Sequence, residues 1–196
     1  AVIRALHRHA DFLRAVVSSA SNDRRLGGNE APPAIMSLFL GDQLTDILEQ
    51  FRVGQVTGST GKRIMNVGVD TLPPLPADPG DRNRTSPFAF VGNRFEFRAL
   101  GSSMSAADSL VALNTMIAES LDYAATFLEK TIQTGAGLGV AVQKLIEHVM
   151  EEDSAVIFNG NGYSPVWQKE AERRHLPNYP ATPDAAPVFS TPAVVE

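Results

Sequence analysis

The chain has 196 residues, of which 43% are hydrophobic and 20% are charged, and this composition suits one globular domain or part of a larger one. Its formal net charge of -5 argues against a nucleic-acid partner, because nucleic-acid-binding proteins usually present a basic face. The absence of cysteine excludes a disulfide framework and a thiolate metal site, and it fits a reducing, cytoplasmic location. We find no apolar run long enough for an export signal or a membrane span, so we expect no membrane partner.

The first residues have the spacing of an amphipathic helix, whose apolar stripe consists of Ile3, Leu6, Leu13, Val16 and Val17. Because the chain begins inside this helix, we expect it to be an excerpt or a processed product. Residues 21–23 are predicted to break the helix. Residues 26–33 then predict a loop, since two glycines permit unusual backbone angles and two prolines disfavour a helix.

The remaining elements follow from periodicity and from turn residues. Residues 34–40 predict a buried strand or short helix, and residues 52–80, rich in glycine and proline, predict a hairpin or long loop. Strands are predicted at 88–91 and 94–100. Helices are predicted at 44–51, 106–133, 140–151 and 165–174, the last with an N-cap at Ser164. The predicted apolar side of the longest helix consists of Leu110, Leu113, Ile117, Leu121 and Leu128.

The strongest candidates for a binding or catalytic role lie in residues Arg94–Arg98, in which apolar and charged side chains alternate. In a strand, Phe95 and Phe97 face one side and the three charged residues face the other. Taken alone, this pattern is typical of a solvated strand face with ion pairs. However, four more arginines, at positions 24, 25, 82 and 84, lie beside glycine- and proline-rich backbone. Arginine forks bind carboxylates and phosphates bidentately, so this set favours an anionic ligand, and Glu96 among the arginines favours a divalent cation as well.

Three long motifs resemble the glutamine synthetases of type III. They are residues 22–35 (NDRRLGGNEAPPAI), residues 81–98 (DRNRTSPFAFVGNRFEFR), and residues 158–164 (FNGNGYS) with the Trp, Glu-Ala and Arg-Arg residues that follow. The resemblance covers nearly the whole chain in the right order. It implies an α+β fold in which strands of an antiparallel sheet pack with long helices. Residues 1–175 would be an incomplete, C-terminal part of the catalytic domain, and residues 176–196 a proline-rich tail, extended or disordered.

The resemblance also implies an activity and its cofactors. The family amidates glutamate with ammonia at the expense of ATP, through a γ-glutamyl phosphate, with Mg2+ (or Mn2+) as the metal. Its members form homo-oligomeric rings. By position in the motifs, Arg25 resembles an arginine that contacts glutamate, and Glu30 resembles the flap glutamate that closes the site and helps to take a proton from ammonium.

The second motif implies four further roles. Arg84 resembles an arginine that stabilises the transferring phosphoryl group of ATP, and Arg94 matches a basic position near the ATP phosphates. Glu96 resembles a metal ligand. Arg98 resembles the arginine beside the glutamate carboxylate and the γ-phosphoryl group. Ala89 stands where the better-known bacterial type has another phosphate-contacting arginine, which weakens the transfer of a role to Arg84.

The resemblance leaves part of the expected site unaccounted for. The other metal-binding glutamates, the metal-binding histidine and the N-terminal domain of the family all lie upstream of the matched region. One carboxylate, Glu96, cannot hold two or three divalent ions, so we expect the isolated chain to be inactive. Two alternatives remain open: a truncated, non-catalytic paralogue that associates with full-length subunits, and a related γ-glutamyl-amine ligase.

Overall fold

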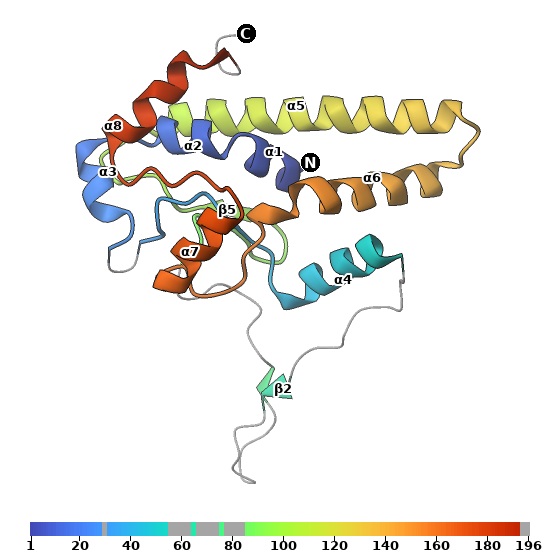
Figure 1. Cartoon of the computed structure of the whole chain (residues 1–196), viewed down its shortest axis with the longest axis horizontal. Coiled ribbons are helices and arrows are strands. Elements are labelled where there is room, and N and C mark those ends of the chain that lie inside the picture. Colours follow the sequence, from blue (N-terminus) through green and yellow to red (C-terminus); the bar gives the residue numbers. More distant parts are fainter. Residues whose placement is uncertain (29–30, 55–63, 66–74, 77–84, 193–196) are drawn as a thin grey trace.

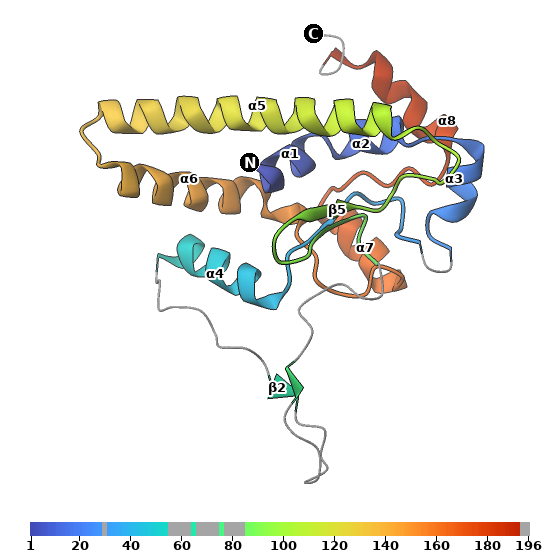
Figure 2. The same cartoon turned by 180° about the vertical axis from the view of Figure 1, so that it is seen from behind.

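The computed structural model describes residues 1–28, 31–54, 64–65, 75–76 and 85–192. The elements in chain order are α1 (Val2–Arg8), α2 (Ala10–Val16), α3 (Ala20–Arg25), β1 (Leu38–Phe39), α4 (Asp42–Val53), β2 (Ile64–Met65), β3 (Leu75–Pro76), β4 (Phe88–Phe90), β5 (Phe95–Phe97), α5 (Ala106–Gln133), α6 (Leu138–Asp153), η1 (Ser154–Val156), α7 (Pro165–Arg173), α8 (Thr182–Ala185) and η2 (Ala186–Ser190). The fold is α+β, as the resemblance implied. In Figures 1 and 2, α5 and α6 form a long hairpin, with α1 and α2 beside α5 and with α4 beside α6. No described helix is both long and apolar enough to cross a membrane.

The predicted N-terminal helix is present but divided. His9 has non-helical backbone angles and separates α1 from α2. The prediction that residues 21–23 break the helix is wrong, because these residues lie inside α3. The break comes earlier, at Val17–Ser19, where the Ser19 hydroxyl accepts a hydrogen bond from the Asn22 N–H and caps α3. Polar residues that favour turns are also favourable in a first helical turn once such a cap is present.

The main sheet has three strands in the order β1-β4-β5, and it is mixed rather than wholly antiparallel. β1 runs parallel to β4, with Leu38 opposite Phe88, and β4 runs antiparallel to β5, with Ala89 opposite Glu96. The long connection between β1 and β4, which includes α4, permits the parallel pairing. Phe95 stacks on Phe88 with ring centroids 5.6 Å apart, so one face of β5 joins the core, as the alternation predicted. In the segment predicted as a hairpin or long loop, β2 and β3 form a short antiparallel pair.

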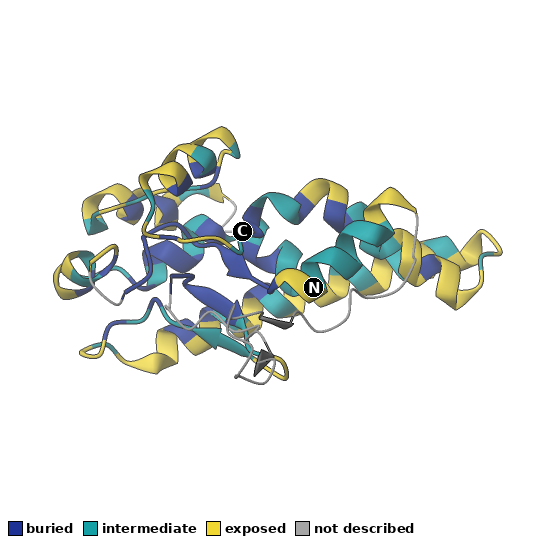
Figure 3. Ribbon diagram, turned by 90° about the horizontal axis from the view of Figure 1, so that it is seen from below, coloured by how far each residue is buried: buried dark blue, intermediate teal, exposed yellow. Residues whose placement is uncertain are grey.

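The core lies where α1, α2, α5 and the sheet meet, and Figure 3 shows buried residues gathered there, away from the far end of the α5–α6 hairpin. α5 begins and ends where the sequence predicted. Its buried side differs from the predicted one, since Leu110 and Leu121 are exposed and Leu113 and Ile117 are half-buried. The buried residues of α5 are Ser109, Ala112, Met116 and Ser120. These mostly small side chains allow close approach, and the Ser120 hydroxyl donates to the Ala1 carbonyl 2.8 Å away.

Residues 177–192 differ from the extended or disordered tail that the sequence predicted. Residues 182–190 form α8 and η2, which pack against α2. Ala185 and Val188 are buried against Ala15, and Phe189 makes an edge-to-face contact with Phe12 at 6.3 Å. Prolines occupy the first turns of both helical segments, where a missing N–H costs little, so the high proline content is compatible with helix.

Candidate functional site

Four of the six predicted site residues lie in the described part of the chain: Arg25 at the end of α3, and Arg94, Glu96 and Arg98 in and around β5. The other two, Glu30 and Arg84, lie outside the described residues. The site is therefore built here from α3 and from the charged face of β5.

The charged face of β5 carries one carboxylate held between two guanidinium groups. Arg94 Nη2 donates to Glu96 Oε1 at 3.1 Å, and Arg98 Nη2 donates to Glu96 Oε2 at 3.1 Å. The two arginines differ in environment, since the side chain of Arg94 is 65% exposed and that of Arg98 is 14% exposed. Arg94 and, in part, Glu96 are therefore reachable from solvent, while Arg98 is held close to the protein.

Glu96 is a carboxylate at neutral pH. The hydrogen bond from Arg98, with further attraction from both arginines, holds the pKa of Glu96 below its usual value of 4.5. An ionised carboxylate is an oxygen ligand of the kind that Mg2+ prefers. Among the described residues, no group of three or more His, Cys, Asp or Glu side chains is placed to hold a metal ion. The described residues thus fit one ligand of such an ion, Glu96, and not a whole coordination shell.

Arg25 connects α3 to the end of β5. Its Nε–H donates to Asn22 Oδ1 at 2.9 Å, and its Nη2 donates to the Arg98 carbonyl at 3.2 Å. Burial lowers the pKa of the Arg25 guanidinium from its usual value, and arginine still remains charged at neutral pH. The structure therefore brings together the first and second motifs, which are 73 positions apart at this contact.

The third motif supports the fold in the described residues. Trp167 stacks on Phe158 with ring centroids 3.7 Å apart, and the Arg174 guanidinium lies 5.6 Å from the Trp167 ring. Arg174 also donates to the Ile157 carbonyl at 2.8 Å, and Glu170 accepts hydrogen bonds from Arg174 and Arg173. These contacts join α7 to the segment that leaves η1.

Two residues of the third motif were given no role by the sequence prediction. The side-chain oxygen of Asn159 accepts hydrogen bonds from the Leu40 and Gly41 N–H groups, both at 3.0 Å. A Cβ atom at Gly162 would lie 2.2 Å from the Thr85 carbonyl oxygen, so only glycine allows this approach. The signal that marks both positions is the run of alternating Asn and Gly in the motif, which is typical of a constrained loop.

An open cleft of about 360 Å3 lies between α4, α6 and α7. Its lining residues are Thr45, Glu49, Glu151, Glu152, Ser154, Ala155, Ile157, Asn159, Arg173 and Arg174. None of the four described site residues lines this cleft. Among its charged side chains, Glu49, Arg173 and Arg174 pair with neighbours in or next to their own helices, and Glu152 pairs with Arg8 of α1. The cleft is therefore separate from the charged face of β5.

Comparison with known proteins agrees with the three motifs. Residues 141–196 match the family model of the glutamine synthetase C-terminal domain, a match that extends through α8 and η2. The chain is 44% identical to the type-3 glutamine synthetase of Dictyostelium discoideum over 94% of its length and 25% of the relative. It is 42% identical to a glutamine synthetase of Bacteroides fragilis (94% of this chain, 26% of the relative) and 39% identical to one of Butyrivibrio fibrisolvens (96% and 26%).

This chain spans about a quarter of the length of these curated relatives. The likeness extends over nearly all of its residues. The chain therefore corresponds to a segment of the type III glutamine synthetases.

Proposed function

We propose that these residues form part of an ATP-dependent glutamate–ammonia ligase and supply arginine side chains to its glutamate and phosphate sites. The observation that carries this proposal is the hydrogen bond from Arg25 Nη2 to the Arg98 carbonyl, 3.2 Å long. It places the arginine of the first motif next to the charged face of β5. Residues 1–175 would belong to the catalytic domain, and the protein would act in the cytoplasm as a homo-oligomeric ring.

In the proposed reaction, a γ-carboxylate oxygen of glutamate attacks the γ-phosphorus of ATP, and ADP leaves. Ammonia, after loss of a proton from ammonium, then attacks the acyl carbon, and inorganic phosphate leaves to give glutamine. Charge spreads over the phosphoryl oxygens during the first step, so cationic groups held in place lower its barrier. Arg98 suits this role because it is largely buried and its guanidinium is fixed by Glu96.

The remaining role assignments rest on the resemblance. Arg25 would bind the substrate glutamate, Arg84 and Arg94 would contact ATP, and Arg98 would contact both glutamate and the γ-phosphoryl group. Glu30 would close the site and accept the ammonium proton. Glu96 would provide one oxygen ligand to Mg2+ (or Mn2+), and the bound ion would neutralise charge on the nucleotide phosphates.

We propose further that the 196-residue chain alone is inactive. Among the described residues Glu96 belongs to no group of three or more His, Cys, Asp or Glu side chains that could hold a metal, whereas a divalent ion takes about six oxygen ligands. The remaining ligands would have to come from ATP, from water, or from protein groups outside the described residues. Activity is therefore expected of the complete gene product in which these residues occur.

The proposal is tested by measuring ATP-dependent formation of glutamine from glutamate and ammonia. In the complete gene product, Arg98→Ala is expected to lower kcat/KM by about 100-fold or more, as for loss of a group that stabilises transition-state charge. The matched control is Arg173→Ala, since Arg173 is 73% exposed and pairs with Glu170 on α7; its kcat/KM should stay within about twofold of the original, as for an exposed ion pair. Absence of glutamine formation by the complete product, or unchanged kinetics of Arg98→Ala, contradicts the proposed function. Glutamine formation by the 196-residue chain contradicts only its proposed inactivity.

A further inference from the structure

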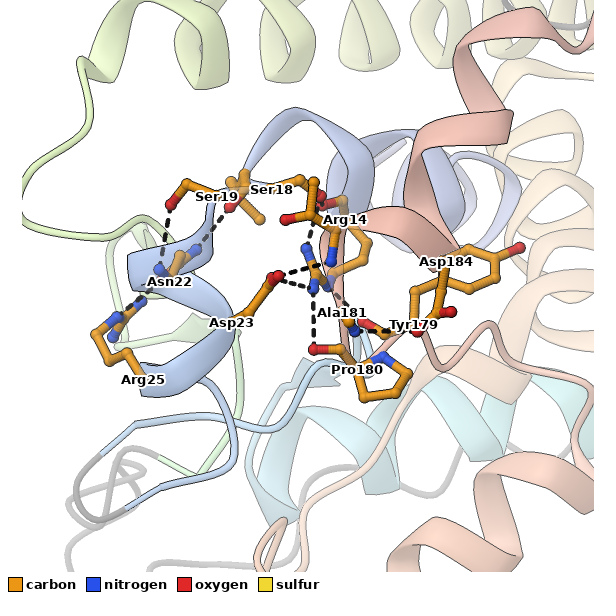
Figure 4. A network of polar contacts seen from close by, with 12 residues as sticks. Arg14, Ser18, Ser19, Asn22, Asp23, Arg25, Tyr179, Pro180, Ala181 and Asp184 are labelled. Atoms are coloured by element: carbon orange, nitrogen blue, oxygen red, sulfur yellow. Dashed lines mark hydrogen bonds and ion pairs between the residues drawn. The ribbon is translucent and has the colours of Figure 1, made fainter.

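We infer that Asn22 is a positioning residue, which sets the guanidinium of Arg25 so that one of its edges faces the substrate. The inference rests on the proposed function, in which Arg25 binds glutamate. Asn22 lies on α3 one helical turn before Arg25, and its side chain is 1% exposed. Figure 4 shows it between Ser19 and Arg25, with hydrogen bonds to both.

The contacts of Asn22 fix the orientation of its amide. Its Nδ2 group donates to the Val17 carbonyl at 2.7 Å and to the Ala99 carbonyl at 2.8 Å. A side-chain amide has its donors on nitrogen and its acceptor on oxygen, so a flipped amide would place oxygen against both carbonyls. The oxygen is therefore left facing Arg25 Nε, at 2.9 Å.

The space around the amide also restricts its movement. A Cβ atom at Gly101 would lie 3.1 Å from Asn22 Oδ1, and Ala99 is fully buried beside it. The planar amide of Asn22 is thus hydrogen-bonded at once to Val17 at the end of α2, to Ala99 and to the side chain of Arg25. If Asn22 served only to join α3 to the segment after β5, the two N–H donors of its amide would be enough. Its amide oxygen is needed only for the hydrogen bond from Arg25.

The two hydrogen bonds of Arg25 hold its guanidinium plane at two points. Nε donates to Asn22 and Nη2 donates to the Arg98 carbonyl, so both use the same edge of the group. Within the part of the chain that the structure describes, the other N–H groups of Arg25 donate to no protein atom. The edge formed by Nη1 and Nη2 remains for a ligand, and this edge matches a carboxylate bidentately.

A double-mutant cycle in the complete gene product tests the inference. Asn22→Ala is expected to raise the KM for glutamate about tenfold, as for loss of a hydrogen bond to a charged group, and to change the KM for ATP less than twofold. Asn22→Asp keeps an oxygen for Arg25 while it loses the two donors, so it should destabilise the fold and yet raise the KM for glutamate less than Asn22→Ala does. Introduced into an Arg25→Ala background, Asn22→Ala should change the KM for glutamate no further.

A stability control and a direct probe of Arg25 complete the experiment. Met116→Ala removes a buried side chain of α5 away from Arg25, and it should destabilise the protein with both KM values unchanged. In labelled protein, exchange of the Arg25 Nε–H with solvent should be at least tenfold faster in Asn22→Ala than in the original. Additive effects in the double variant, equal rises of both KM values, or an unchanged exchange rate overturns the inference. If no variant, nor the original protein, forms glutamine, the proposed function fails instead, and the exchange rate still decides whether Asn22 positions Arg25.

Discussion

Gly162 is the residue with the tightest backbone approach among the described glycines. An added Cβ would lie 2.2 Å from the Thr85 carbonyl, which is backbone and cannot rotate away. We expect Gly162→Ala to lower the free energy of unfolding by about 1–3 kcal/mol, as for overpacking of a close-packed site. Urea unfolding of the 196-residue chain measures this, with Trp167, its single tryptophan, as the fluorescent probe.

Gly139→Ala is the control for this prediction, and it should change the free energy of unfolding in the opposite direction. Gly139 lies in the first turn of α6, and a Cβ added there would meet no atom within 4 Å. Gly139→Ala should raise the free energy of unfolding by about 0.4–1 kcal/mol, because the unfolded chain loses freedom. A Gly162→Ala variant that is as stable as the original would show that the loop moves without cost.

Among the helices, α3 is held in place partly by residues 179–182, which lie far along the chain. Arg14 of α2 is fully buried, and its guanidinium contacts Asp23 Oδ1 at 2.9 Å and the Tyr179 carbonyl at 2.8 Å. Asp23 also accepts a hydrogen bond from the Thr182 N–H. Burial opposes ionisation of Asp23, and the hydrogen bonds from Thr182 and Arg14 outweigh it, so the pKa of Asp23 lies below its usual value of 3.8.

Loss of the Asp23 charge should therefore be costly. We expect Asp23→Asn to reduce the free energy of unfolding at pH 7 by about 3–5 kcal/mol, because it leaves the buried Arg14 without this carboxylate. A depressed folded-state pKa stabilises the protein above the unfolded pKa, and this contribution is lost as the pH falls through the folded pKa. The difference between Asp23→Asn and the original should accordingly shrink in acid.

Denaturant unfolding at pH 7 and in acid measures this effect. Asp108→Asn, at an exposed position in the first turn of α5, is the matched control and should change stability by less than about 1 kcal/mol. An Asp23→Asn variant no less stable than Asp108→Asn, or a difference that does not depend on pH, would contradict the role given to the ion pair.

Local sequence patterns determine some elements of this fold and not others. The helix at 106–133 and the cap at Ser164 follow from periodicity and capping, which depend on neighbouring residues alone. The helical state of residues 21–23 depends on a cap at Ser19, and the buried side of α5 depends on which helices pack against it; neither is visible in hydrophobicity. For the site, alternation predicted the charged face of β5, but the contact between Arg25 and Arg98 arises from tertiary packing. Without the motif resemblance, the arginines would have indicated an anionic ligand but no particular reaction.

The whole molecule presents an apolar surface along the outer side of α5. Its exposed residues include Leu110, Val111, Leu121 and Ile132, of which Val111 is 67% exposed. β5 is also an edge strand of the three-stranded sheet. Extended apolar surface and open strand edges favour association, so we expect the isolated 196-residue chain to self-associate with increasing concentration.

Sedimentation velocity over a range of concentrations measures this association. A Val111→Lys, Leu121→Lys double variant should associate more weakly, because charge on the outer side of α5 opposes burial. Val166→Lys is the control, since Val166 is 73% exposed on α7, away from α5. A chain that remains monomeric at every concentration would contradict the expectation.

The contact between Asp23 and Thr182 also has a consequence for synthesis. The two residues are 159 positions apart, and a ribosome adds about 5–20 residues each second, so roughly 10–30 seconds separate their appearance. During that interval α3, which has six residues and is too short to persist without tertiary partners, lacks its contact with residue 182. The helix that carries the proposed glutamate-binding arginine therefore completes its tertiary contacts late, after residue 182 has left the ribosome.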